Sequence, residues 1–317
     1  MAMGDPPPGA WLSEAAATAF RPDTVVLDVD GVLVDVEPSF REAVRRTVVT
    51  VQEAMGVERP WTPTRADIAA LKRAGGFNDD VQTSIALAAV GAGGASEGLE
   101  ALLAAVDRAG GGLAGLRVAA PHLPRIDGAL CLRVFDEHYW GAYRFRSVFG
   151  EEPRHVTTAA GLVDEERPLV DADLPRRLRE TADVGWVAVI TGRTPAELDA
   201  ALDLLGWSPG DLDAVVTGDV VRKPDPACFD RILGVLGSGA AVYAGDVRDD
   251  WELVRRHRAE RPSGPPVRGV IVGGEAGALR ALGVDATLRD ADDLIPLLRW
   301  WAIDRVARSP EHEPLPP

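Results

Sequence analysis

Short runs of β-branched and aliphatic residues alternate with longer amphipathic stretches over the second half of the chain. These apolar runs lie at 186–190, 214–216, 240–244 and 267–272, and a similar run lies near the start of the chain at 24–27. Runs of this kind are typical of buried parallel strands. The stretches between the later runs follow a helical period, and one of them opens with Thr-Pro-Ala-Glu at 194–197 and ends at Gly206. Strands and helices in alternation predict a parallel α/β sheet of the Rossmann-like kind.

The segment from Glu37 to about Asp164 has a different pattern, without any strand-like run. Glycines separate its amphipathic stretches, at positions where left-handed helix ends are wanted. Helices are expected at 39–55, 64–74, 78–90, 96–109 and 129–149. The first strand is therefore separated from the rest of its sheet by a helical insertion, which predicts a lid or cap domain hinged near Val36 and Asp164.

The predicted fold class is α/β, with a Rossmann-like parallel sheet core and an inserted all-helical cap domain. The core is expected to take residues 21–36 and 165–308, and the cap domain residues 37–164. Both ends of the chain contain proline-rich stretches with few core-forming residues, so we expect flexible tails over 1–20 and 309–317.

Composition narrows the class of protein. The 317 residues are 46% hydrophobic, which is enough for a buried core. A net charge of -15 argues against polyanionic partners, which bind to positively charged protein surfaces. Neither nucleic acid nor a membrane surface is therefore expected as a partner. Two cysteines, no secretory pattern and no long apolar span indicate a soluble, cytoplasmic protein.

Acidic residues follow the first strand directly. Asp28 and Asp30 come after the run at 24–27, where open α/β sheets place ligand sites. If the chain stays extended, their side chains point the same way, and two adjacent like charges call for a cation such as Mg²⁺. The alternative is an Asp- and Gly-rich turn that only closes the strand.

Three later strand ends carry complementary chemistry. Thr191 and Gly192 offer a hydroxyl and backbone N–H groups before a helix, which is the form of a phosphate cradle. Lys223 follows the next strand as a point charge, and a further acidic cluster from Asp246 to Asp250 follows the run at 240–244. Taken singly, Thr191 is equally a helix cap and Lys223 a solvated lysine. Their common place at one sheet edge favours a phosphate site with a metal ion.

The ordered motifs DVDGVLVD, ITGR, KPDP and GDVRDD resemble those of the haloacid dehalogenase superfamily of phosphohydrolases. The segment from Asp28 to Pro38, with the insertion behind it, is similar to the branch that contains phosphoglycolate phosphatases and β-phosphoglucomutases. An acid at Asp30 speaks against dehalogenation, because dehalogenating relatives do not keep one there.

The resemblance implies a role for each motif. Asp28 matches the nucleophile that becomes an aspartyl-phosphate, and Asp30 matches the general acid/base, whose backbone carbonyl is also a metal ligand. Thr191, Gly192 and Lys223 match the phosphate-binding positions. The Mg²⁺ site would be formed by Asp28, Asp30, Asp246 and Asp250, with Asp249 as the alternative to Asp250.

The expected function is hydrolysis of a small phosphorylated metabolite with Mg²⁺ as cofactor. A phosphomutase that uses the same aspartates is the first alternative, and a non-catalytic metabolite sensor is the second. In the insertion, Lys72, Arg73 and Asn78 resemble a loop that contacts the leaving group of the substrate. The equally weighted alternative is that the cations only end a helix.

Overall fold

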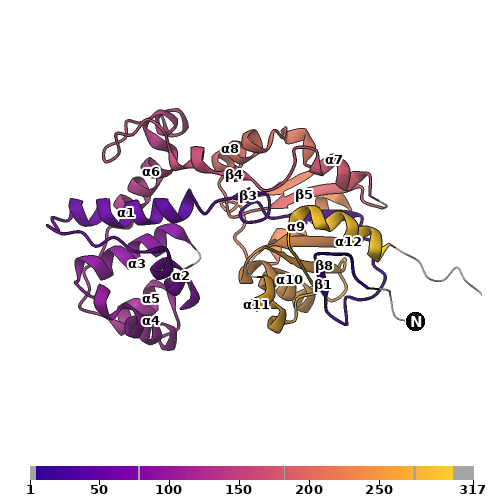
Figure 1. Cartoon of the computed structure of the whole chain (residues 1–317), viewed down its shortest axis with the longest axis horizontal. Helices are drawn as coiled ribbons and strands as arrows, with labels where there is room; N and C mark the ends of the chain where they lie inside the picture. The colour runs from indigo at the N-terminus through magenta and orange to yellow at the C-terminus, as the bar shows by residue number, and fades with distance from the viewer. Residues whose placement is uncertain (1–4, 78, 182, 274–275, 303–317) are drawn as a thin grey trace, which may run out of the picture. The chain divides into compact units, whose positions relative to one another are not determined.

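The computed structural model describes residues 5–77, 79–181, 183–273 and 276–302. Contacts divide the chain into two compact units, 1–35 with 167–317 and 36–166. We call them the sheet unit and the helical unit (Figure 1). The predicted cap domain had bounds of 37–164.

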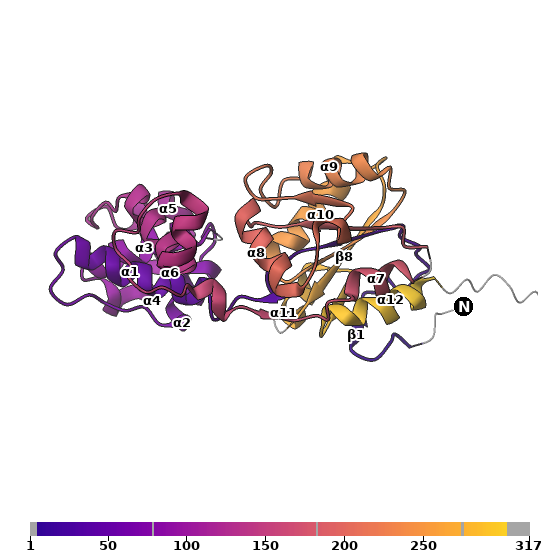
Figure 2. The same ribbon diagram turned by 90° about the horizontal axis from the view of Figure 1, so that it is seen from above.

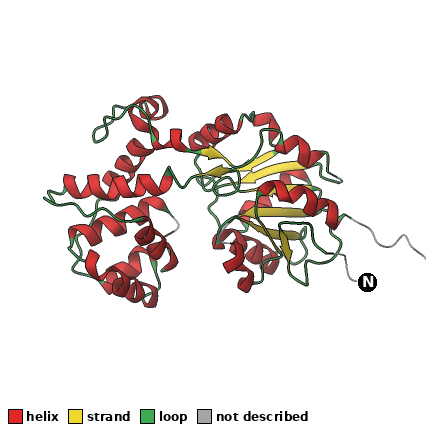
Figure 3. Ribbon diagram, viewed as in Figure 1, coloured by secondary structure: helices red, strands yellow, loops and turns green. Residues whose placement is uncertain are grey.

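A sheet, whose strands are yellow in Figure 3, forms the centre of the sheet unit. It has seven strands in the order β1-β9-β8-β7-β2-β5-β6. Every pair is parallel except β1 with β9. The strands are β1 (Ala10–Leu12), β2 (Thr24–Leu27), β5 (Trp186–Ile190), β6 (Ala214–Val216), β7 (Ala241–Gly245), β8 (Val267–Val272) and β9 (Ala286–Leu288). The parallel α/β core predicted from the sequence is thereby confirmed.

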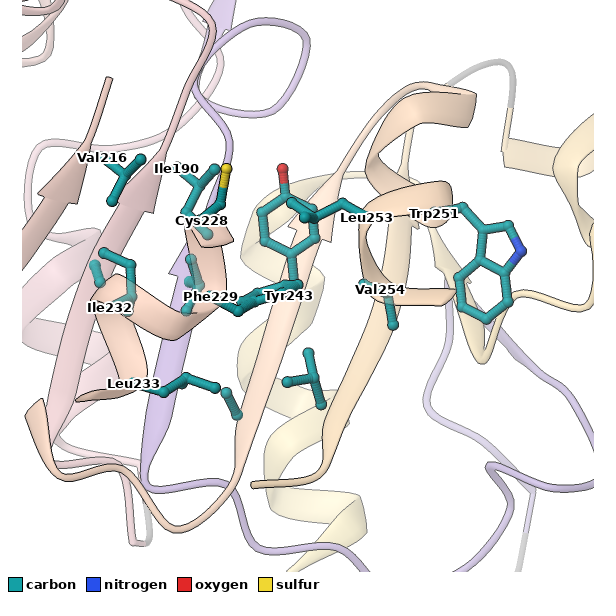
Figure 4. Close-up of a cluster of buried hydrophobic side chains, with 14 of the residues drawn as sticks. Ile190, Val216, Cys228, Phe229, Ile232, Leu233, Tyr243, Trp251, Leu253 and Val254 are labelled. Carbon is teal, nitrogen blue, oxygen red and sulfur yellow. The ribbon is translucent and has the colours of Figure 1, made fainter. Parts of the chain in front are cut away.

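Helices pack on the sheet through alternate strand residues. Figure 4 shows Phe229 of α9 (Ala227–Leu236) and Val254 of α10 (Arg248–Glu260) in one buried cluster with Tyr243 of β7. In Figure 2, α7 (Leu174–Arg179) and α12 (Leu294–Trp301) lie on the other side of the sheet from α9 and α10. The other α-helices among the described residues of this unit are α8 (Pro195–Leu205) and α11 (Ala276–Leu279).

The expected loose tail over 1–20 is wrong for its second half. Strand β1 pairs with β9, and Trp11 lies against the guanidinium of Arg280 at 5.0 Å from the ring centroid. Ala16 is buried, and its carbonyl accepts a hydrogen bond from Trp301 Nε1. Strand β1 has only three residues and none of them is β-branched, so it does not stand out in the sequence as a strand. The expected tail over 309–317 lies outside the described residues.

A second, two-stranded sheet lies where the chain leaves and re-enters the sheet unit. It pairs β3 (Val34–Asp35) with β4 (Arg167–Pro168) in antiparallel register. The two connections to the helical unit therefore start from one small ladder.

The helical unit holds no strand among its described residues. Its helices are α1 (Phe40–Ala54), α2 (Arg65–Arg73), α3 (Asp80–Ala92), α4 (Leu99–Arg108), α5 (Gly112–Ala119) and α6 (Gly128–Phe149). The sequence did not predict α5, and α6 is not continuous, because Gly141 has φ +65° and ψ +164°. A Cβ at Gly141 would lie 2.4 Å from the backbone of Ala160, so the kink and the close chain approach occur together. No helix in the described ranges has both the length and the apolar character to cross a membrane.

Candidate active site

The carboxyl ends of three neighbouring strands bring predicted site residues to one edge of the sheet. Strand β2 lies between β5 and β7, and its last residue, Leu27, is level with the next-to-last residue of each neighbour. The chain continues beyond these ends into Asp28, Thr191 and Asp246. Asp28 also extends the pairing, because its backbone N–H donates to the Ala244 carbonyl at 2.8 Å.

Lys223 joins Asp28, which follows β2, to Asp250, which lies in the first turn of α10. Its Nζ lies 2.7 Å from Asp28 Oδ2 and 2.8 Å from Asp250 Oδ1, and all three side chains are largely buried. Lys223 is therefore not a solvated loop lysine, which was the alternative interpretation of this residue. The ammonium group compensates one of the negative charges gathered here.

Asp250 is the more fully bonded of the two carboxylates. Its Oδ1 accepts from Lys223 and from the Tyr243 hydroxyl at 2.6 Å, and its Oδ2 accepts from the backbone N–H groups of Asp246 and Val247, each at 3.0 Å. Four donors match the four lone-pair sites of a carboxylate. Asp250, rather than Asp249, is therefore the acid of the last motif that belongs to the cluster.

The pKa values reflect an excess of negative charge. Burial raises the pKa of Asp28 to about 7, with Asp250 and Asp30 acting in the same direction and Lys223 against it. Burial likewise raises the pKa of Asp246 well above its usual range, and Asp250 and Asp28 add to the effect. Burial would also raise the pKa of Asp250, but Lys223 and the hydrogen bonds lower it. One lysine cannot neutralise three such carboxylates.

The donor set fits a hard divalent cation. Asp28, Asp246 and Asp250 each offer an oxygen, and these atoms lie within 4.8 Å of one another. Gly31 has φ +71°, and a Cβ there would lie 2.1 Å from Asp246 Oδ2, so only glycine lets this carboxylate take its place. Because Asp250 already accepts four hydrogen bonds, Asp28 and Asp246 are the side chains that remain for a metal ion.

Asp30 has a different environment from the one expected. Strand β2 ends at Leu27, and residues 31–33 form a turn. The chain therefore does not stay extended through Asp30, and the expectation that its side chain points the same way as that of Asp28 does not apply. Asp30 Oδ1 instead accepts a hydrogen bond from Arg193 Nε at 2.7 Å. The carboxylate is thus held by a cation and does not belong to the group of Asp28, Asp246 and Asp250.

Thr191 and Gly192 lie before helix α8, as predicted. Thr191 is buried, and its Oγ1 accepts from the backbone N–H of Arg193 at 3.2 Å. Gly192 is exposed, and its carbonyl approaches Gly218 so closely that a Cβ on Gly218 would lie 2.2 Å away. The helix cap itself is Thr194, whose side chain accepts from Glu197, so the alternative role for Thr191 as that cap is excluded.

The predicted substrate residues of the insertion belong to the helical unit. Lys72 Nζ lies 2.8 Å from Asp80 Oδ1 and so links the end of α2 to the start of α3. Arg73 lines a groove of about 480 Å³ between α2 and α4, together with Asp67, Glu100 and Asp107. Asn78 lies outside the described residues. A role of these side chains toward a substrate stays a prediction.

Sequence reasoning does not identify two residues that hold the site together, Tyr243 beside Asp250 and Arg193 beside Asp30. Tyr243 was seen only as part of a strand, although a tyrosine within an otherwise aliphatic run is a signal of a buried hydroxyl that needs a partner. Arg193 was seen only as the residue after Thr191 and Gly192, and no pattern in the sequence shows that its side chain is buried.

Comparisons with known proteins concern the family and the fold of this chain. The family model of haloacid dehalogenase-like hydrolases matches residues 22–251. Phosphatase Tt82 from Thermococcus thioreducens is 27% identical, with a TM-score of 0.63, over 87% of this chain and 97% of that chain. A structure from Lactobacillus delbrueckii subsp. bulgaricus, named for a phosphoglycolate phosphatase, is 16% identical, with a TM-score of 0.50, over 88% and 99%. A search of curated proteins found no match.

The family model spans both segments of the sheet unit that carry the cluster, and it includes the helical unit. The motif order in the sequence, the parallel sheet and the strand-end cluster all agree with this match. The chain therefore belongs to the haloacid dehalogenase-like hydrolases.

Proposed function

We propose that this protein is a Mg²⁺-dependent phosphatase that hydrolyses a small phosphorylated metabolite through an aspartyl-phosphate on Asp28. The observation that carries the proposal is the placement of Lys223 between Asp28 and Asp250, at the edge that also holds Thr191 and Asp246. The similarity to a phosphatase at 27% identity supports the same reaction class.

In the proposed first step, an oxygen of Asp28 attacks phosphorus while the bond to the leaving oxygen breaks. Phosphoryl transfer depends mainly on positioning and on charge stabilisation, and the site offers both. The Val29 backbone N–H and Lys223 hold the two oxygens of Asp28, at 2.8 and 2.7 Å. Lys223, Thr191 and the N–H groups near Gly192 would bind the transferring group.

Asp30 would act as the general acid and then as the general base. It gives a proton to the leaving oxygen in the first step. In the second, it takes a proton from water as that water attacks phosphorus, and the bond to Asp28 breaks to release phosphate and the free carboxylate. Proton and bond changes balance over the two steps.

Asp28, Asp246 and the backbone carbonyl of Asp30 would hold the Mg²⁺ ion, with Asp250 fixing Lys223 and the Asp246 backbone. When bound, the ion supplies positive charge that lets an anionic carboxylate and an anionic phosphate ester approach each other. The excess negative charge of the cluster is the reason to expect it.

The helical unit would act as the cap and supply contacts to the rest of the substrate. Lys72 and Arg73, with Asn78 beside them in sequence, are the candidates, because an acidic protein must draw an anionic ester by local positive charge.

The test is turnover of a panel of phosphorylated sugars, acids, amino alcohols and nucleotides with Mg²⁺, followed by Asp28→Asn on the best substrate. The amide is nearly isosteric but cannot attack phosphorus, so activity should fall at least about 1,000-fold. Asp171→Asn, at an aspartate of the same unit that is 82% exposed, is the matched control and should keep full activity. An active Asp28→Asn protein would contradict the proposal.

Product analysis separates the two enzymatic alternatives. A phosphatase releases free phosphate without a phosphorylated primer, whereas a phosphomutase isomerises its substrate and depends on one. Failure of the whole panel, with metal and phosphate still bound, would instead favour the non-catalytic sensor.

A further inference from the structure

Arg193 is a buried cation beside the predicted acid/base residue. Its side chain has no exposed surface, whereas that of Asp30 is 32% exposed. Its Nε donates to Asp30 Oδ1 at 2.7 Å, and its Nη1 donates to the Glu197 carbonyl at 3.0 Å. The guanidinium therefore bridges the loop after β2 and the first turn of α8.

Stability alone does not explain this bridge. Removing a guanidinium and a carboxylate from water costs free energy that a single ion pair often fails to regain. A chain that only needed to join this loop to α8 would be served as well by an apolar side chain. The planar and permanently charged guanidinium instead offers a fixed direction of hydrogen bonding, which lysine does not.

The difference in exposure separates the roles of the two side chains. Asp30 is open enough to meet a substrate or a water molecule, but Arg193 is not. An effect of the Arg193 guanidinium on the reaction would therefore act through a neighbouring group, and Asp30 is the partly exposed carboxylate that it binds. The hydrogen bond engages Oδ1 of the carboxylate and leaves Oδ2 outside that bond.

We infer that Arg193 is a positioning residue that fixes the Asp30 carboxylate by Oδ1 and makes Oδ2 the oxygen that carries the proton. This inference rests on the function proposed above. The Oδ2 proton passes to the leaving oxygen as the ester bond breaks and the Asp28–phosphorus bond forms. In the second step, Oδ2 regains a proton from the attacking water. Without Arg193 the carboxylate rotates freely, and the geometry that makes proton transfer fast is lost.

Arg193→Gln and Arg193→Lys test the inference with two matched probes. Phenyl phosphate has a basic leaving group that needs the proton, whereas 4-nitrophenyl phosphate has a leaving group that departs as the anion. We expect kcat/KM of Arg193→Gln to fall about 10-fold to 100-fold more on phenyl phosphate than on 4-nitrophenyl phosphate. Arg193→Lys keeps the charge without the planar fork and should give a smaller selective loss, so it also serves if the glutamine variant folds poorly.

Thr194→Ala is the control for local structure. It removes the side-chain cap of the same helix, and its hydroxyl hydrogen-bonds with Glu197. It should therefore leave unchanged the ratio of kcat/KM on phenyl phosphate to kcat/KM on 4-nitrophenyl phosphate. Equal losses on both substrates in the Arg193 variants, or no loss, would overturn the inference.

Asp30→Asn separates a failure of this inference from a failure of the proposed function. We expect Asp30→Asn alone to lower the ratio of kcat/KM on phenyl phosphate to kcat/KM on 4-nitrophenyl phosphate. The double variant with Arg193→Gln should show no further decrease in this ratio. A normal ratio in Asp30→Asn would overturn the acid/base role of Asp30, and the inference with it. A low ratio in Asp30→Asn with a normal one in Arg193→Gln would overturn the inference alone.

Discussion

The sheet unit and the helical unit each contain one of the two lysines of the chain, and they use it differently. Lys223 is buried between two carboxylates, whereas Lys72 is 27% exposed and pairs with one. The helical unit makes an ordinary link between two helices. The sheet unit concentrates charge where burial makes it costly, and such an arrangement requires a reason other than stability.

Buried carboxylates show the same contrast. Burial would raise the pKa of Glu137 in α6, but the backbone N–H groups of Arg154, His155 and Val156 and the Arg133 guanidinium lower it. The pKa of Asp246 in the sheet unit moves the other way. A buried carboxylate whose oxygens all accept hydrogen bonds, such as Glu137, stabilises the fold. A buried carboxylate beside other carboxylates, such as Asp246, needs a cation to offset the repulsion.

The largest effect should come from Lys223→Met, which keeps the length of the side chain and removes its charge. Asp28 and Asp250 would be left buried without their cation, so we expect a loss of about 3–5 kcal/mol in the free energy of unfolding. Activity should fall at least about 1,000-fold. Lys72→Met, measured by the same denaturant titration, should lose no more than about 1 kcal/mol. Similar losses at both lysines would erase the contrast between the units.

Glu137→Gln should be the strongest single substitution in the helical unit. The amide would turn an N–H₂ group toward backbone donors, so at least one buried N–H loses its acceptor, at a cost of about 2–3 kcal/mol. The expected result is a lower Tm with unchanged kcat on a small aryl phosphate. Glu152→Gln, at a side chain that is 74% exposed, is the matched control. A stable Glu137→Gln protein would show that the donors need no charged partner.

Metal binding should stabilise the sheet unit and leave the helical unit unaffected. A ligand at 100 times its Kd stabilises the folded state by about 2.7 kcal/mol. We therefore expect Mg²⁺ to raise the Tm by several degrees, and chelation to abolish both this gain and the activity. Asp246→Asn should be insensitive to Mg²⁺, and without metal it should be at least as stable as the parent, because it relieves repulsion. Full activity after exhaustive chelation would contradict the metal dependence.

The helical unit should weaken in mild acid because of His138. Burial lowers the pKa of this imidazole from 6.5 to about 4, with Arg46 acting in the same direction, and Thr50 Oγ1 lies 3.0 Å from its Nε2. A lowered pKa means that the unfolded chain binds the proton first. Stability is therefore complete above pH 6.5 and decreases as the pH falls toward 4. Asp28 and Asp246, whose pKa values are raised, act in the opposite direction as the pH falls. The contribution of His138 is therefore the difference between the Tm profiles of the parent and of His138→Gln, which should reach the order of 5 °C between these pH values.

The smallest effect is expected at the predicted substrate contacts. Lys72→Ala or Arg73→Ala should lower kcat/KM about 10-fold on the best metabolite and hardly at all on 4-nitrophenyl phosphate, because remote contacts contribute to positioning. Equal loss on both substrates would indicate a role in folding of the helical unit. No loss on either would mean that the two cations serve only the helix end.

The sheet could be predicted where its strands contain β-branched and aliphatic residues in sequence, as β2 and β6 do despite their shortness. The site could be predicted because polar residues follow these strands at or shortly after their ends. Strands β1 and β9 were not predicted, whereas β6, which is equally short, was predicted because it contains two adjacent valines. Helix α5 begins with glycine, which is read as a break. Arg193 was missed for a deeper reason. Burial of an arginine depends on packing, and a basic residue is by default assigned to solvent.

The placement of β1 has a consequence for synthesis of the chain on the ribosome. Its partner β9 is made roughly 270 residues later, so at about 5–20 residues per second the first strand waits on the order of 15 to 55 s for its pairing. The helical unit, in contrast, is one uninterrupted segment, 36–166, and is complete before β5 emerges. Asp28 is therefore translated early, but Lys223 follows only after β5 and β6 have been made, and Asp250 only after β7 as well. The carboxylates can thus gather at the strand ends only once the four strands around the site, β2, β5, β6 and β7, are available.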